Sequence, residues 1–221
     1  VLVDIASTIT IDLKFGGAAA ASNGKIIFAP YNADGVGVFD PSDNSFALVD
    51  IASTISTDGK FIGAAAASNG KIIFAPYKED GVGVFDPSDN SFVLVDIAST
   101  ISTDAKFRGA ATAGNGKVIF APFNADGVGV FDPSDNSFAL VDIASTISTD
   151  RKFQGPATVS NGKVIFVPSA ANGLGIFVPS NFQCDASTAP TNGGLGNCTD
   201  TLEIGSTCTI TCDAGYVPFS A

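Results

Sequence analysis

The sequence predicts an all-β fold built from tandem repeats, and three observations support this. The segment Leu-Val-Asp-Ile-Ala-Ser-Thr occurs four times at a spacing of 46 residues, beginning at Leu2, Leu48, Leu94 and Leu140. Each repeat is rich in β-branched and aromatic residues, with turn-forming pairs between them. No window shows a sustained helical period. A repeat of this length is typical of a solenoid, a propeller or another array.

Four strands are expected within each repeat. In the second repeat they cover residues 63–67, 71–76, 82–86 and 92–97. The first turn contains Asn69-Gly70, and we expect a positive φ at both positions. The second turn is Lys78–Gly81, and the third begins at Pro87, whose ring presets φ. Tight turns of this kind join antiparallel neighbours, so each repeat predicts one four-stranded antiparallel sheet.

The strand Ile72–Ala75 is apolar on both faces, which predicts a sheet that is buried on both sides. A blade of a β-propeller lies between like blades in this way, and the alanine-rich run 63–67 fits the crowded inner position near the axis. A linear stack of meanders is the alternative. We expect a repeat domain over residues 1–180, with repeats at about 1–46, 47–92, 93–138 and 139–180.

The two ends of the repeat domain complement each other in sequence. Residues Leu2 to Ile5 have the sequence of a fourth strand, and the last repeat supplies strands one to three but no Leu-Val-Asp-Ile after Pro179. The N-terminal strand could therefore complete the last blade and close a four-bladed ring. Two alternatives stay open: half of a larger ring built by two chains, or an excerpt from a longer array.

The pattern Lys-Phe, Gly-Ala-Ala-Ala, Asn-Gly-Lys-Ile-Ile-Phe-Ala-Pro and Phe-Asp-Pro, as it stands between Lys14 and Pro41, carries a family resemblance. It resembles the repeats of secreted kelch-like and quinoprotein-like β-propeller proteins of algae and other protists. The resemblance covers residues 1–180 four times over. It implies propeller blades and no particular function, because such blades host many unrelated roles.

Residues 181–221 form a second expected module, because all four cysteines lie there: Cys184, Cys198, Cys208 and Cys212. An even cysteine count in a short segment indicates a disulfide framework, with three connectivities open. The run from Gly205 to Tyr216 is similar to the first half of a sushi module, which implies an incomplete module. Disulfides predict an extracellular location, and Asn197 begins a glycosylation sequon.

Composition excludes several function classes. The chain has 11 basic and 22 acidic residues and a net charge of −11, which argues against nucleic acid as a partner. No apolar run approaches the ~20 residues that a membrane span needs. The absence of histidine excludes histidine-based triads and histidine-ligated metals.

Two sets of residues recur as site candidates in the turn between the second and third strands. The carboxylates are interpreted as turn formers, with weak calcium ligation as the alternative and no other cofactor expected. The aromatic residues would stack on sugars if exposed and would belong to the core if buried. The carboxylates are Asp34, Asp80 and Asp126, and the aromatic residues are Tyr31, Tyr77 and Phe123.

The functional expectation is an extracellular structural or assembly protein, such as a subunit of a fibre, sheath, appendage or cell-wall layer. Near-identical blades favour repetitive contacts with copies of the same chain. Every blade carboxylate has copies in other blades, so no unequal acid–base pair stands out and we expect no enzyme. The alternative is a secreted lectin-like or ligand-binding propeller with one weak site per blade.

Overall fold

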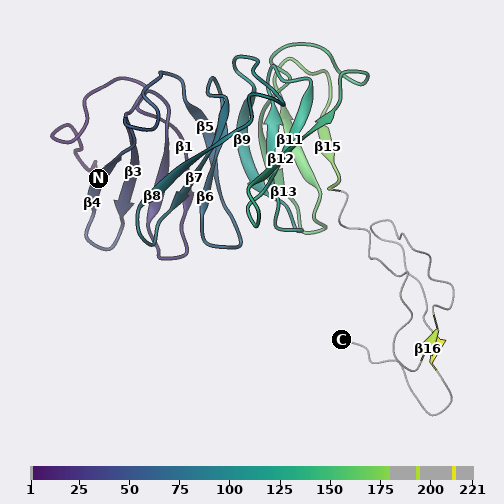
Figure 1. Ribbon diagram of the computed structural model, residues 1–221, viewed down its shortest axis with the longest axis horizontal. Coiled ribbons are helices and arrows are strands. Elements are labelled where there is room, and N and C mark those ends of the chain that lie inside the picture. The colour runs from purple at the N-terminus through teal and green to yellow at the C-terminus, as the bar shows by residue number, and fades with distance from the viewer. Residues whose placement is uncertain (1, 180–192, 195–210, 213–221) are drawn as a thin grey trace.

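The computed structural model describes residues 2–179, 193–194 and 211–212 and shows four antiparallel sheets side by side (Figure 1). The first three sheets have four strands each, and the fourth has three. The first sheet is β1 (Phe15–Ala20), β2 (Ile26–Pro30), β3 (Gly35–Asp40) and β4 (Ser45–Asp50). The second is β5 (Phe61–Ala66), β6 (Ile72–Pro76), β7 (Gly81–Asp86) and β8 (Ser91–Asp96). The third is β9 (Phe107–Thr112), β10 (Val118–Pro122), β11 (Gly127–Asp132) and β12 (Ser137–Asp142). The fourth is β13 (Phe153–Thr158), β14 (Val164–Pro168) and β15 (Gly175–Phe177).

Within each sheet the strands follow chain order and pair with their sequence neighbours. The predicted repeat of four strands is therefore confirmed, and so is the last repeat with its three. Separately, β16 (Gly193–Gly194) pairs antiparallel with β17 (Thr211–Cys212). Among the residues that the structure describes, no helix is long and apolar enough to cross a membrane.

The first strands of successive sheets touch one another: β1 contacts β5, β5 contacts β9, and β9 contacts β13. Their backbones come so close that glycine is required at the contact. A Cβ added to Gly63, whose φ is +106°, would lie 2.4 Å from the Cα of Gly109. This close approach explains why the first strand keeps a glycine at this position in every repeat, and it fits the crowded inner position that the sequence predicted.

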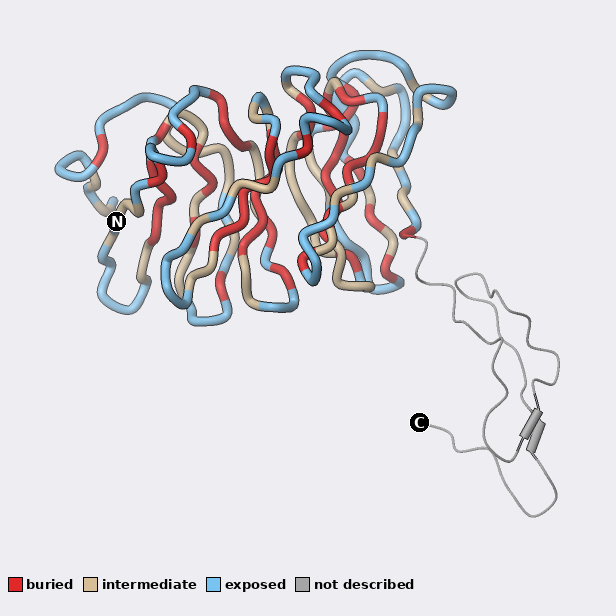
Figure 2. The backbone as a smooth tube through the Cα atoms, in the orientation of Figure 1, coloured by how far each residue is buried: buried red, intermediate tan, exposed pale blue. Residues whose placement is uncertain are grey.

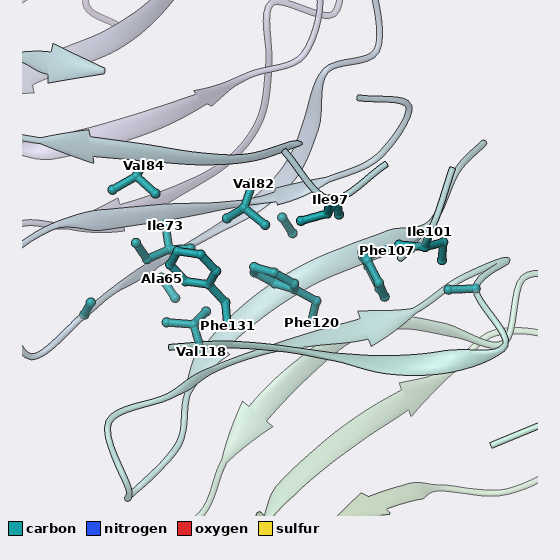
Figure 3. Packing of buried hydrophobic residues seen from close by; sticks show 13 residues of the cluster. Ala65, Ile73, Val82, Val84, Ile97, Ile101, Phe107, Val118, Phe120 and Phe131 are labelled. Carbon is teal, nitrogen blue, oxygen red and sulfur yellow. The ribbon is translucent and has the colours of Figure 1, made fainter. Parts of the chain in front are cut away.

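Each sheet presents a different apolar face to each neighbour, and the centres of the sheets are buried (Figure 2). The face toward the preceding sheet carries phenylalanines, and we call it the phenylalanine face; in the second sheet it is Phe61, Ile72, Phe74 and Phe85. The face toward the following sheet is the aliphatic face; in the second sheet it includes Ala65, Ile73, Val82 and Val84. Figure 3 shows this second face meeting Phe107, Phe120 and Phe131 of the third sheet.

The Asn-Gly turns differ from the expectation that both positions have a positive φ. Gly70 has a φ of +85°, whereas Asn69 is not among the residues with positive φ. The Asn69 side chain stabilises the turn by hydrogen bonding. Its Oδ1 accepts a hydrogen bond from the Lys71 amide, and its Nδ2 donates one to the carbonyl of Pro133 in the next sheet. The asparagine therefore links neighbouring blades as well as shaping its own turn.

The closure of a four-bladed ring within one chain is not observed. Residues 2–5 form no strand, and the first and fourth sheets lie at opposite ends of the row of sheets (Figure 1). In the described part of the chain, β15 pairs on one edge only, with β14. As far as residues 2–179 are concerned, the row is therefore open at both ends.

Candidate functional site

The two ends of the sheets carry different connections. One end, which we call the connection end, holds the β2–β3 type of turn and the segments that lead from one sheet to the next. The opposite end, the turn end, holds the β1–β2 and β3–β4 types of turn. This follows from the antiparallel order, because every second connection returns to the same end.

A buried lysine clamps each sheet to the preceding one at the connection end. Its backbone N–H donates to the carbonyl of the aromatic residue in the preceding sheet at 2.8–2.9 Å. Its ammonium contacts a carboxylate of that sheet at 3.4, 2.6 and 3.2 Å in the three successive interfaces. The lysines are fully buried and the aspartates are about half exposed. The pairs are Lys60–Asp34, Lys106–Asp80 and Lys152–Asp126.

These ion pairs give the candidate calcium carboxylates a different cation. Asp34, Asp80 and Asp126 each bind the ammonium of the next sheet's lysine. In the described residues, no three His, Cys, Asp or Glu side chains gather into a group that could hold a metal ion. The geometry therefore assigns these aspartates to contacts between blades.

The aromatic candidates form a row across the first three sheets. The ring centroids of Tyr31 and Tyr77 are 5.9 Å apart, and those of Tyr77 and Phe123 are 6.3 Å apart. Phe123 is buried, whereas both tyrosines are half-buried. Within the described part of the chain neither tyrosine hydroxyl has a hydrogen-bond partner, and neither is a buried unpaired group. The row thus leaves both tyrosines, with their hydroxyls, partly accessible to solvent, whereas Phe123 is covered.

Polar side chains of the third and fourth sheets extend this row into the fourth sheet. The Arg108 guanidinium lies 4.9 Å from the centroid of the Phe123 ring. Its Nη1 donates a hydrogen bond of 2.6 Å to Gln154 Oε1, and Gln154 Nε2 donates one of 2.8 Å to Ser169 Oγ. We call these contiguous residues the polar-aromatic strip; they are Tyr31, Tyr77, Phe123, Arg108, Gln154 and Ser169.

The strip occupies two of the four positions at which the repeats differ most. Four positions of the 46-residue repeat hold three or more different residue types. Two flank the start of the first strand and two lie in the turn after the second strand, so all four are at the connection end. They are Leu13/Gly59/Ala105/Arg151, Gly16/Ile62/Arg108/Gln154, Tyr31/Tyr77/Phe123/Ser169 and Asn32/Lys78/Asn124/Ala170.

Sequence reasoning missed Arg108 and Gln154, which lie in the first strands of their repeats. The sequence analysis selected residues that the repeats share, and in this structure the shared residues form the strands, the turns and the contacts between sheets. A position-by-position comparison of the repeats would have found both, because their position holds a different residue in every repeat.

The acidic turns at the opposite end have a structural role. Asp86 Oδ1 accepts hydrogen bonds from the Ser88 hydroxyl at 2.6 Å and from the Ser88 amide at 2.9 Å. These bonds favour the ionised carboxylate and hold the pKa of Asp86 below its ordinary value. The same arrangement lowers the pKa of Asp40 and of Asp132.

The candidates of the second module lie mostly outside the described residues. These are Cys184, Cys198, Cys208 and the glycosylation candidate Asn197. Cys212 ends β17, but the description does not extend to its side chain. The disulfides, the glycan and the sushi-like module therefore stay predictions.

Comparison with known proteins supports the fold but no family. No protein-family profile matches the chain, and no curated protein matches it. Among solved structures, virginiamycin B lyase of Staphylococcus aureus superposes with a TM-score of 0.63 at 16% identity, covering 75% of this chain and 52% of the lyase. The WD40 repeats of RRP9 superpose with a TM-score of 0.61 at 11% identity, covering 77% and 50%.

A third similar structure is the extracellular domain of a hybrid two-component system of B. thetaiotaomicron, with a TM-score of 0.60, 18% identity, and 80% and 23% coverage. The chain thus spans about half the length of the lyase. At these identities the likeness shows the fold alone, which is a β-propeller arrangement of four-stranded blades.

This likeness contradicts the prediction that the chain is not an enzyme. Virginiamycin B lyase is an enzyme, so blades of this kind are compatible with catalysis. The prediction relied on every blade carboxylate having copies in like surroundings. The structure shows unlike surroundings at the connection end, where Arg108, Gln154 and Ser169 have no identical counterparts in the other repeats.

Proposed function

We propose that the chain is an extracellular ligand-binding propeller that holds a linear, neutral oligosaccharide along the polar-aromatic strip. One observation carries the proposal: near-identical repeats differ most at one end of the sheets, and side chains from two of these variable positions form a contiguous strip there. The residues that build the frame are repeated, and the residues free to differ lie where a ligand would meet the blades.

The chemistry of the strip suits sugars. Tyr31 and Tyr77 combine apolar ring surface with hydroxyl groups that face solvent, and such residues contact both the C–H faces and the hydroxyls of a sugar. Arg108 and Gln154 add guanidinium and amide groups that donate and accept hydrogen bonds. A net charge of −11 disfavours an anionic ligand, so a neutral glycan is the better match.

The strip favours one composite site rather than one weak site per blade. The aromatic residue of the first two repeats is tyrosine, that of the third is a buried Phe123, and Ser169 replaces it in the fourth. Arg108 and Gln154 belong to adjacent blades and bond to each other. A ligand that crosses the blades would therefore contact different groups along its length. Only an extended ligand, such as a linear oligosaccharide, could reach all of them.

Binding to an array of neutral linear oligosaccharides, followed by calorimetric titration of the strongest ligand, tests the proposal. We expect Tyr77→Ala and Arg108→Ala each to weaken binding about tenfold, which is the effect of losing roughly 1.4 kcal/mol of contact energy. Lys117→Ala is the matched control, because it removes a cation from the same blade at the turn end.

Equal affinity of all three variants, or no binding to any neutral glycan, would refute the proposal. The expected role as a structural subunit of a fibre, sheath, appendage or wall layer stays a prediction. The extracellular location depends on the cysteine pattern of residues 181–221.

A further inference from the structure

The first sheet leaves its phenylalanine face open in the described part of the chain. Phe15, Phe28 and Phe39 are partly exposed, whereas the corresponding Phe61, Phe74 and Phe85 of the second sheet are fully buried. The second sheet buries these rings against the first sheet's aliphatic face. The first sheet therefore carries an apolar surface that elsewhere in this chain is covered by a preceding blade.

Among residues 2–179, nothing covers the aliphatic face of the fourth sheet, which is the opposite kind of face. Its aliphatic face includes Val167, Leu174 and Ile176, which are 53%, 69% and 63% exposed. Their counterparts in the second sheet, Ala75, Val82 and Val84, are 0%, 0% and 5% exposed because the third sheet covers them. The two open faces of one chain are thus the two halves of the interface that this chain forms three times internally.

Within the described residues, the fourth sheet also has no fourth strand beside β15. A Cβ added to Gly35 would lie 2.6 Å from Leu48 Cγ of β4, and one added to Gly81 would lie 2.5 Å from Leu94 Cγ of β8. A Cβ added to the equivalent Gly173 meets nothing within 4 Å. In the described part of the chain, a cavity of about 470 Å³ opens there, lined by Val128, Ile143, Ile147, Phe166, Leu174 and Ile176, among others.

We propose that a second copy of this chain docks head to tail on the fourth sheet, with its first sheet stacked on the aliphatic face and its Leu2–Asp4 segment added to β15 as the fourth strand. This proposal is independent of the oligosaccharide site, which lies at the connection end. Leu2 to Asp4 repeat the sequence of the fourth strands, and Leu2 is 94% exposed.

A single docking geometry covers the aliphatic face of the fourth sheet and also adds a fourth strand to β15. In the first sheet Gly35 pairs with Asp50, Val36 with Val49, and Gly37 with Leu48. The same register in the assembly sets Leu174 opposite the second copy's Val3 and Gly175 opposite its Leu2. The second copy's Leu2 then fills the cavity as Leu94 fills the equivalent space between the first two sheets. Within each chain, the segment after a fourth strand leads directly to the next sheet. The Leu2–Asp4 segment and the first sheet of the second copy are joined in the same way, so both can occupy their places at once.

The lysine clamp identifies a weak point of this interface. Lys14 occupies the position of Lys60, but its ammonium contacts the carbonyl of Ile11 at 2.6 Å and stays partly exposed. In the assembly Lys14 belongs to the docking copy, and its partner on the fourth sheet of the receiving copy would be Asn172, which replaces the aspartate of the other three repeats. The assembly therefore keeps the apolar contacts of the internal interfaces and loses their ion pair, which predicts a reversible association.

Each copy docks through its first sheet and receives another copy on its fourth sheet, so the contact is heterologous. Such contacts give either a closed ring or an open filament. The chain spans about half of virginiamycin B lyase, on which its blades superpose. Two copies accordingly supply about a full ring of blades, and a closed dimer is the expected product.

Light scattering of the full chain over a concentration series tests the association. We expect a mass twice that of one 22.3 kDa chain at high concentration and a return to the single-chain mass on dilution. Ile176→Asp should give the single-chain mass throughout. Val93→Asp is the matched control, since Val93 is 54% exposed on β8 of the second sheet, away from the open faces of the first and fourth sheets. Asn172→Asp should restore the ion pair and lower the dissociation constant about tenfold.

Crosslinking distinguishes a second copy from closure within one chain. A Val3→Cys chain mixed with a Leu174→Cys chain should give a covalent dimer under oxidising conditions, because the two positions face each other in the register above. Val3→Cys mixed with Val93→Cys controls for the native cysteines. A single-chain mass at every concentration, or equal crosslinking in both mixtures, would overturn the proposal.

Discussion

Lys106 Nζ lies 2.6 Å from Asp80 Oδ1, and this contact joins a fully buried lysine of the third sheet to a half-exposed aspartate of the second. The ammonium also donates to the carbonyl of Lys78 at 3.1 Å. The same arrangement recurs in the interfaces on either side. The pair therefore belongs to the frame that holds the blades together and positions the connection end.

Removing the carboxylate should destabilise the chain more than removing the lysine charge. Asp80→Ala leaves the buried Lys106 ammonium with a carbonyl as its partner, and we expect a loss of about 1–3 kcal/mol, since the aspartate is partly solvated. Lys106→Met keeps the buried volume without a charge and should cost less. Urea unfolding measures both; a loss for Asp80→Ala no larger than for the exposed Asp58→Ala would contradict the assignment.

The contact between first strands predicts that replacing Gly63 destabilises the chain by a steric clash. A second glycine with a positive φ, Gly70, measures the cost of the backbone conformation alone. Gly63 and Gly70 both have positive φ, but only Gly63 faces a neighbouring backbone, with its added Cβ 2.4 Å from Gly109 Cα. Gly70→Ala should cost about 1–2 kcal/mol. Gly63→Ala should cost about 3 kcal/mol or more, because the sheets must also move apart. Equal unfolding midpoints for the two variants would show that the blades do not touch at this point.

One residue in each connection between sheets has a left-handed backbone, and glycine occupies that position only before the second sheet. The φ values are +74° at Gly59 and +56° at Ala105. Ala105→Gly should therefore stabilise the chain by up to about 1 kcal/mol. The control is Ala98→Gly, because Ala98 is an exposed turn residue without a positive φ and should gain nothing. A loss of stability in Ala105→Gly would contradict the backbone assignment.

Acid should weaken the turn that Asp86 caps. The Ser88 hydroxyl and amide hold the pKa of Asp86 below its ordinary value in the folded chain. A carboxyl with a depressed folded pKa stabilises the chain above its unfolded value, and that contribution is lost as the pH falls through the folded value. Thermal unfolding between about pH 5 and about pH 2 should show a smaller decline for Asp86→Asn than for the unaltered chain. Parallel curves would refute the capping role.

The strands and turns of each repeat could be predicted because local chemistry fixes them. Pro87 presets a turn, and the two-sided apolar strand Ile72–Ala75 indicates burial between sheets. The boundaries of β5 to β8 differ from the predicted ones by one or two residues. Glycine and alanine in the first strand also indicated the crowded inner position, which the contact of Gly63 with Gly109 confirms.

The candidate site could be predicted only in part, because it is assembled from neighbouring sheets. Tyr31 and Tyr77 were identified by their recurrence, but the bond between Arg108 and Gln154 joins residues 46 positions apart. Asp34 was expected in a turn, and its pairing with Lys60 depends on how adjacent sheets stack. Such contacts are set by packing between repeats rather than by the sequence around each residue.

Amide chemical-shift mapping by NMR tests the binding end most directly. The isotope-labelled chain would be titrated with the neutral oligosaccharide that the array identifies. The account predicts shifts concentrated at Tyr77, Arg108, Phe123 and Gln154, with the turn-end residues Asn69 to Lys71 unchanged. Shifts concentrated in those turns, or spread evenly over the repeats, would contradict a composite site at the connection end.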